Sequence, residues 1–234
     1  NTLNVSTQHV SEDKYLKLYK IKSNIVDFNN DTLENSLSFT HEKDDLFFGL
    51  NVNIYETLKD NYNDKYEYIL PEITLDKNLI NNQKFGELGM QTNLKIHNYD
   101  TNKLNSFLVN EINWRSNNKI SKFGLNTNLL GNIKNINYES KNDPIYKNDP
   151  TSELFGTLGY FTQLKLRKNS ALNKHFLTPK MLVRYAPGAM RNETSGSRLD
   201  PTTAFDLDRL NETNNVETGL TSTLGIDYNI KNNN

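Results

Sequence analysis

The stretch Leu177-Thr-Pro-Lys-Met-Leu-Val-Arg-Tyr-Ala-Pro187 decides the fold of this chain. Polar side chains at Thr178, Lys180 and Arg184 alternate with apolar ones. The apolar face consists of Leu177, Pro179, Met181, Val183 and Tyr185, and Leu182 is the one apolar residue on the other face. Because successive side chains of a strand point to opposite faces, the pattern predicts a β-strand with one apolar and one charged side. The strand should end at Pro187, which cannot donate to a ladder.

The same two-residue alternation recurs along the chain. The ranges that carry it are 32–40, 48–54, 66–79, 88–97, 104–115, 119–136, 154–167 and 218–228. We expect the range 66–79 to be a strand pair or one strand broken at Pro71, and the range 119–136 to be one long strand. Residues 137–152 hold two Asn-Asp-Pro triplets and should form a loop. The chain is therefore expected to be all-β, an antiparallel up-and-down meander of about ten strands.

The charge balance of the chain restricts its partners. It has 234 residues, with 27 basic and 28 acidic side chains and a formal net charge of -1. This balance leaves no basic footprint for nucleic acid, so we expect no nucleic-acid partner. Cysteine is absent, which excludes disulfides, thiolate metal sites and cysteine nucleophiles.

Residue types and spacings give no indication of catalysis or of a cofactor. The four histidines are His9, His41, His97 and His175, and they lack the close spacing of metal ligands. A phosphate loop, a dinucleotide fingerprint and the strained serine turn of hydrolases are all missing. We therefore expect no enzyme, no metal site and no cofactor.

Hydropathy alone does not exclude a membrane protein. No window approaches the roughly 18 consecutive apolar residues of a membrane-spanning helix. A membrane β-barrel, however, alternates apolar and polar residues over strands of about 10 residues, so its mean hydropathy is low. The chain starts at Asn1. We interpret it as an interior fragment, for which the missing signal peptide says nothing about localisation.

Three stretches, in this order, resemble the LPS-assembly outer-membrane protein family (LptD/OstA). Residues 12–19 are similar to the family's acidic loop D-x-Y-L-(R/K)-x-Y, and residues 68–73 are similar to its Leu-Pro-Glu strand start. Residues 178–187 with 205–210 are similar to a later barrel segment, TP-x-x-x-x-RY-(A/S)-P followed by F-x-L-x-R-L. The matching residues are Tyr15, Leu16, Tyr19, Pro71, Glu72, Pro179, Arg184, Tyr185, Pro187, Phe205, Leu207 and Arg209.

The resemblance implies a fold, a function and partners. Residues 1–234 would be part of one large outer-membrane β-barrel domain, with the family's N-terminal periplasmic domain and closing strands outside the chain. The barrel would translocate lipopolysaccharide and assemble it into the outer leaflet of a Gram-negative outer membrane. Its partners would be lipopolysaccharide, membrane lipid, an outer-membrane lipoprotein plug, and a periplasmic transport bridge that docks on the missing domain.

Basic residues opposite the apolar faces are the candidate substrate contacts. They are Lys95, Lys165, Arg167, Lys180 and Arg184. In a barrel these side chains would point into the lumen, where they can pair with the phosphates and acidic sugars of lipopolysaccharide. The alternative is a generic wet lumen, whose wall is polar in any barrel.

Two other functions remain open at this point. One is a passive porin-type barrel with a comparable lumen. The other is a soluble β-sandwich or β-helix that binds carbohydrate or serves as an adhesin. The apolar faces discriminate between them, because two packed sheets hide these faces in a core, whereas a barrel exposes them around its waist.

Overall fold

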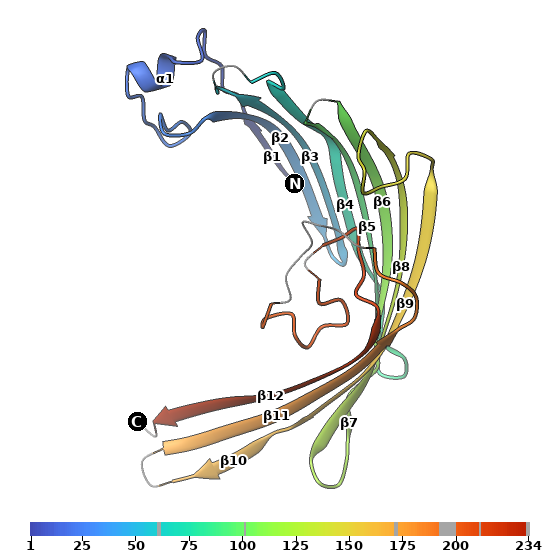
Figure 1. Cartoon of the computed structure of the whole chain (residues 1–234). Coiled ribbons are helices and arrows are strands. Elements are labelled where there is room, and N and C mark those ends of the chain that lie inside the picture. Colours follow the sequence, from blue (N-terminus) through green and yellow to red (C-terminus); the bar gives the residue numbers. More distant parts are fainter. Residues whose placement is uncertain (60–61, 101, 171–172, 192–199, 211, 233–234) are drawn as a thin grey trace. The chain divides into compact units, whose positions relative to one another are not determined.

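The computed structural model describes residues 1–59, 62–100, 102–170, 173–191, 200–210 and 212–232. Within these residues, twelve antiparallel strands form one sheet, and α1 (Tyr15–Leu18) is the only helix (Figure 1). The strands are β1 (Thr2–Ser6), β2 (Thr32–Lys43), β3 (Leu46–Thr57), β4 (Tyr66–Asn82), β5 (Gly86–Tyr99), β6 (Lys103–Arg115), β7 (Lys119–Ile120), β8 (Leu125–Lys141), β9 (Thr151–Leu164), β10 (Leu166–Asn169), β11 (Asn173–Ala186) and β12 (Gly219–Asn232). The predicted all-β class is confirmed.

The strands are hydrogen-bonded almost in chain order. The path runs β1-β2-β3-β4-β5-β6-β8-β9-β11, while β7 pairs with β8, and β10 and β12 pair with β11. This order is the predicted up-and-down meander, with two short strands beyond the ten or so expected. Within the described residues β1 and β12 do not pair with each other, so the sheet is open.

The prolines interrupt the ladders where backbone donors are missing. Between β3 and β4 the register shifts by one residue, from the pair Asn51↔Glu72 to the pair Asn53↔Ile69. Val52 of β3 therefore lies opposite two residues of β4, Leu70 and Pro71. Of the two predicted alternatives, the structure therefore has one strand with a bulge at the proline. Both β9 and β10 pair with β11, one on each side of Pro179, and the two ladders share one register. β9 and β10 are therefore one continuous partner of β11, and its pairing is interrupted only at this proline.

The prediction of one long strand over 119–136 was wrong. The chain instead forms a hairpin, in which β7 pairs with the start of β8 through Lys119↔Thr127 and Ile120↔Asn126. The turn closes through a hydrogen bond from the Gly124 amide to the Ser121 carbonyl. Gly124 has a φ of 81°, which favours glycine, and this left-handed residue reverses the chain.

The chain divides into two compact units. Unit 1 comprises Asn1–Lys77, Gln91–Asn110 and Ile136–Glu153, and unit 2 comprises Asn78–Met90, Glu111–Asn135 and Leu154–Asn234. In unit 1 the register brings apolar residues of neighbouring strands onto one face, through Leu37↔Val52, Phe39↔Leu50 and Leu50↔Ile73. The intervening pairs, such as Ser38↔Asn51, form the polar face.

Unit 2 has the same two-faced structure, and its apolar face is exposed. The pairs Met181↔Leu224 and Pro179↔Ile226 place apolar side chains of β11 and β12 together, and Leu224 is 75% exposed. Other exposed apolar residues on this face are Leu158, Tyr160, Tyr185, Leu220, Ile226 and Tyr228. On the opposite face Leu182 is fully buried. The described residues form one sheet and not the two packed sheets of a sandwich.

Candidate functional site

A segment between β11 and β12 covers the polar face of unit 2. We call residues 200–210 and 212–218 the strap. It begins with a turn at Asp200, whose carboxylate accepts hydrogen bonds from the backbone amide and the hydroxyl of Thr202. A second turn follows, in which the Asp206 amide donates to the Thr203 carbonyl. These turns lead the chain into the F-x-L-x-R-L stretch at 205–210, which makes most of the contacts with the sheet.

Two apolar side chains of the strap pack where the sheet carries glycine. A Cβ atom added at Gly225 would lie 2.7 Å from Cζ of Phe205, and one added at Gly159 would lie 2.4 Å from Cδ2 of Leu207. The Phe205 ring also meets Phe161 edge-on, with ring centroids 6.2 Å apart. The strap therefore docks at two positions where side chains larger than hydrogen would clash with it.

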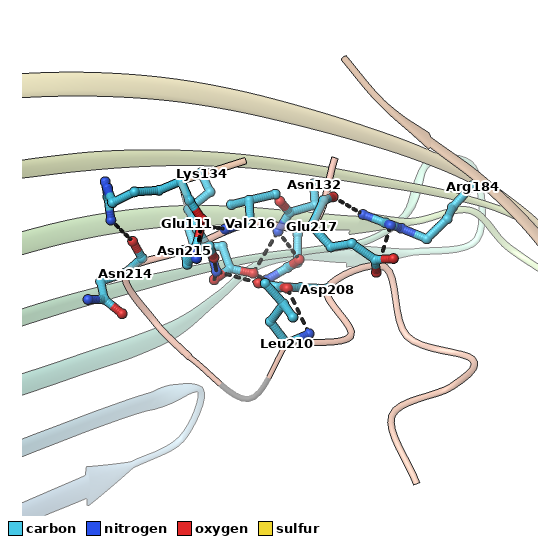
Figure 2. Close-up of polar contacts among 12 residues, drawn as sticks. Glu111, Asn132, Lys134, Arg184, Asp208, Leu210, Asn214, Asn215, Val216 and Glu217 are labelled. Atoms are coloured by element: carbon cyan, nitrogen blue, oxygen red, sulfur yellow. Dashed lines mark hydrogen bonds and ion pairs between the residues drawn. The ribbon is translucent and has the colours of Figure 1, made fainter. Parts of the chain in front are cut away.

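Arg184 of β11 is bound to the strap by a carboxylate. It is 1% exposed, its Nη1 lies 3.0 Å from Oε2 of Glu217, and its Nη2 donates to the Glu217 carbonyl at 2.6 Å. Arg209 of the strap binds the same carboxylate through Nε at 2.7 Å and through Nη2. The hydrogen bond from Arg209 lowers the pKa of Glu217 below its usual value. Glu217 thus compensates two guanidinium groups, and Figure 2 shows its contact with that of Arg184.

Lys134 of β8 forms the second anchor of the strap. Its side chain is 2% exposed and is paired with Asp208 of the strap and with Glu111 of β6, the latter at 3.6 Å (Figure 2). Asn132 donates to Glu111 at 2.6 Å. Burial raises the pKa of Asp208, although the neighbouring ammonium of Lys134 opposes this rise. A buried lysine needs such partners because an isolated charge is costly away from water.

A pocket of about 430 Å³ lies beside the second anchor. Its lining includes Leu207 and Asp208 from the strap and Glu111 and Trp114 from β6. Trp114 is the only tryptophan of the chain, and its Nε1 donates to the Phe85 carbonyl at 2.8 Å. Its ring lies beside Gly131, on the face of the sheet that the strap does not cover.

Unit 1 has a polar cluster of its own at the loop between β8 and β9. Asp143 of this loop accepts hydrogen bonds from the Tyr99 hydroxyl at 3.0 Å and from Asn105 at 2.8 Å. The Ile145 amide donates to the other carboxylate oxygen at 2.9 Å. The loop predicted at 137–152 is shorter than expected, because β8 extends to Lys141 and β9 begins at Thr151. The remaining loop, 142–150, is held against β5 and β6 by the buried Asp143.

The structure places the five predicted substrate contacts in different surroundings. In unit 2, the register puts Lys180 and Arg184 on the polar face, and Arg167 lies opposite Phe176 on that face. Lys180 is paired with Asp227, and Arg167 donates from Nε to Asn169 at 2.8 Å. Lys165 follows β9 and is exposed. In unit 1, Lys95 lies 3.9 Å from Glu72.

The family-like residues all occupy defined structural positions. Tyr15, Leu16 and Tyr19 belong to α1 and its end, and Pro71 and Glu72 lie at the β4 bulge. Pro179 interrupts the β11 ladder, Tyr185 lies on the apolar face, and Pro187 follows the end of β11. Phe205 and Leu207 pack on the sheet, and Arg209 binds Glu217.

Sequence reasoning missed the anchors Lys134, Asp208 and Glu217. The alternation of β8 contained a usable signal, since Asn126, Asn128, Asn132 and Lys134 all fall on one face. The pairing of Lys134 with Asp208 joins residues 74 positions apart and could not be read from spacing.

The depressed pKa of Glu217 predicts how acid affects the strap. A carboxylate whose pKa is lowered by folding stabilises the docked state above its unfolded value of 4.5 and loses this effect as the pH falls through the lower value. We expect the anisotropy of a fluorophore on Asp206→Cys to fall as the pH drops below 4.5 and Glu217 becomes protonated. Adding Glu217→Gln should abolish this transition, and a transition that persists in this variant would contradict the assignment.

Among the described residues, no histidine, aspartate and glutamate side chains are grouped so that they could hold a metal ion. No helix in the described part of the chain is long and apolar enough to cross a membrane. No protein-family model matches this chain, and no curated protein sequence matches it.

Proposed function

We propose that this chain is a segment of an outer-membrane β-barrel that assembles lipopolysaccharide into the outer leaflet of a Gram-negative outer membrane. The observation that carries the membrane part of this proposal is the exposed apolar face of unit 2. Leu220, Leu224 and Ile226 on β12 are each about 70% exposed or more. A continuous apolar face of this kind is unfavourable in water and favourable in lipid.

The hydrogen bonding of the sheet supports the same proposal. An antiparallel meander satisfies the backbone groups of its inner strands between neighbours, which a bilayer core requires; in the proposed barrel, further strands would pair with the edges β1 and β12. The polar face of unit 2 carries ion pairs and amide groups. Such a face suits a wet lumen.

The lipopolysaccharide part of the proposal rests on the three family-like stretches. The strap gives one of them a physical role, because its phenylalanine and leucine pack on the polar face and its arginine binds the carboxylate that pairs with Arg184. Transport of this kind needs no catalytic group. In the proposed assembly a lipoprotein would plug the lumen, and a periplasmic bridge would deliver the lipid to a domain outside this chain.

Photo-crosslinking in cells tests the proposed function. Lys165 is the best position on the polar side because it is exposed, whereas Arg184 is buried beneath the strap. A crosslinker at Lys165 of the full-length protein should capture newly made lipopolysaccharide, and the capture should disappear when lipopolysaccharide synthesis is stopped. This dependence is expected because only lipid in transit would contact the lumen.

A crosslinker at Leu224, on the apolar face, is the matched control. It should capture membrane lipid irrespective of ongoing synthesis, because bulk lipid surrounds a barrel continuously. Lipid capture at Leu224 with none at Lys165 would identify a passive porin-type barrel. Absence of lipid at Leu224 would contradict the membrane location itself.

A further inference from the structure

The segment before β2 carries an exposed surface that the strap site does not use. We call residues 12–28 the hook; they include α1. The inner side of the hook packs on the sheet through Leu16, which forms a buried cluster with Leu33 of β2 and with Leu58. Val10, Ile21, Val26 and Phe28 pack against this cluster.

Ion pairs and backbone bonds hold the hook in shape. Lys17 is paired with Asp31, and Lys22 with Asp27 at 2.8 Å. The Ile21 amide donates to the Leu16 carbonyl at 3.1 Å. The apolar side chains on the outer side therefore stay exposed, because the buried cluster below them is already packed.

The outer side of the hook carries exposed apolar side chains with lysines among them. Leu18, Tyr19 and Ile25 are exposed by 65%, 68% and 65%, and the rings of Tyr15 and Tyr19 are 4.9 Å apart. The lysines around them, which are all exposed, are Lys14, Lys17, Lys20 and Lys22. Tyrosine prefers the interface between lipid and water, and lysine can extend its ammonium to headgroups while its stem stays in apolar surroundings.

The position of the hook along β2 matches this chemistry. Leu33 lies beneath the hook, on the same face of the strand as Leu37 and Phe39. The three residues share a face because they are separated by even numbers of residues. At about 3.3 Å per residue, Leu33 lies about 13 Å from Leu37 along the strand. Half of a hydrocarbon core measures about 15 Å. With Leu37 near the middle of the bilayer, the hook would lie at its surface.

The hook is small for a protein-binding surface. A stable protein interface buries about 800 Å² on each partner. Four exposed apolar side chains around a one-turn helix supply less than this area, whereas a membrane surface can accept a few side chains and several lysines.

We propose that the hook is a membrane-surface anchor, in which Leu18 and Tyr19 enter the interface and Lys14 and Lys20 bind anionic lipid headgroups. This inference rests on the proposed function, because the apolar face of the sheet must lie in a bilayer for the hook to reach one. It adds a lipid-binding site that is separate from the polar face.

Site-specific fluorescence tests the anchor, since the chain has no native cysteine to interfere. An NBD label on Leu18→Cys leaves the buried Leu16 untouched. The labelled full chain, reconstituted in vesicles of phosphatidylcholine mixed with phosphatidylglycerol, should show a blue-shifted emission that a headgroup-attached quencher reduces. The shift should be smaller in vesicles of phosphatidylcholine alone.

Charge variants give the second arm of the experiment. Lys14→Gln with Lys20→Gln keeps the ion pairs of Lys17 and Lys22 intact. Each substitution should lower the insertion equilibrium of the hook about five-fold, since a lysine near an anionic surface contributes about 1 kcal/mol. Lys141→Gln with Lys147→Gln, which removes two exposed charges elsewhere in unit 1, should leave the emission unchanged.

A second label, on Leu224→Cys, separates failure of the anchor from failure of the proposed function. A water-like label at Leu18 with a lipid-embedded label at Leu224 would overturn the anchor alone. An equal response at Leu18 in both kinds of vesicle would overturn the role of anionic headgroups. Water-like labels at both positions would overturn the anchor and the membrane proposal together.

Discussion

Replacing Glu217 by glutamine is expected to weaken docking of the strap by about 3 kcal/mol, or roughly a hundred-fold. The substitution removes the carboxylate shared by Arg184 and Arg209. Arg184 is 1% exposed and cannot move its charge into solvent while the strap is docked. Removing one partner of a buried ion pair costs more than the pair contributes, because it leaves an uncompensated charge.

Proteolysis of the folded protein measures this effect directly. Trypsin should cut the Arg209–Leu210 bond only when the strap detaches, so the cleavage rate reports the free energy of local opening. Asp206→Asn is the matched control, because it removes one negative charge from an exposed position of the same segment. Equal cleavage rates for the two variants would contradict the buried role of Glu217.

Placing arginine at Leu50 is expected to destabilise the folded protein in a bilayer by about 2 to 4 kcal/mol if this residue lies near the midplane. Leu50 is on the apolar face of unit 1, where it pairs with Phe39 and Ile73. A guanidinium there would have to leave water for hydrocarbon. The free energy of unfolding, measured by denaturant titration in liposomes, checks this expectation.

Asn51→Arg is the control for this change. Asn51 is the next residue of β3, points to the polar face, and lies opposite Glu72, which can pair with the new charge. Its substitution should cost little. If Asn51→Arg were the more damaging variant, the assignment of the two faces in unit 1 would be reversed.

The strand pattern and the two faces could be predicted because they depend on local sequence. Alternation along β2, β3, β11 and β12 assigns each side chain to a face without knowledge of any partner strand. The pairs Phe39↔Leu50 and Met181↔Leu224 then follow once neighbouring strands pair in chain order. The hairpin at 119–124 was missed, because the apolar pattern continues across it and only Gly124 marks the reversal.

The sequence singled out the F-x-L-x-R-L stretch, through its resemblance to the LPS-assembly family, and Arg184, through its position on a polar face. It did not show that this stretch lies across that face or what it contacts. The sequence did not reveal the counter-ions of the basic face, because Glu217, for example, is 33 residues from Arg184 in the chain. In the structure, Asp227, Glu217 and Asp208 neutralise Lys180, Arg184 and Lys134, respectively.

The sequence by itself therefore determined the strand class, the order of the meander and the division into an apolar and a polar face. These features follow from two-residue alternation and from turns that act within a few residues. Only the tertiary structure decided which charges compensate one another, where the strap docks, and that α1 presents lysines and tyrosines outward from a packed base. Such contacts depend on the path of loops through space, because buried charges and apolar side chains find partners that are distant in the chain.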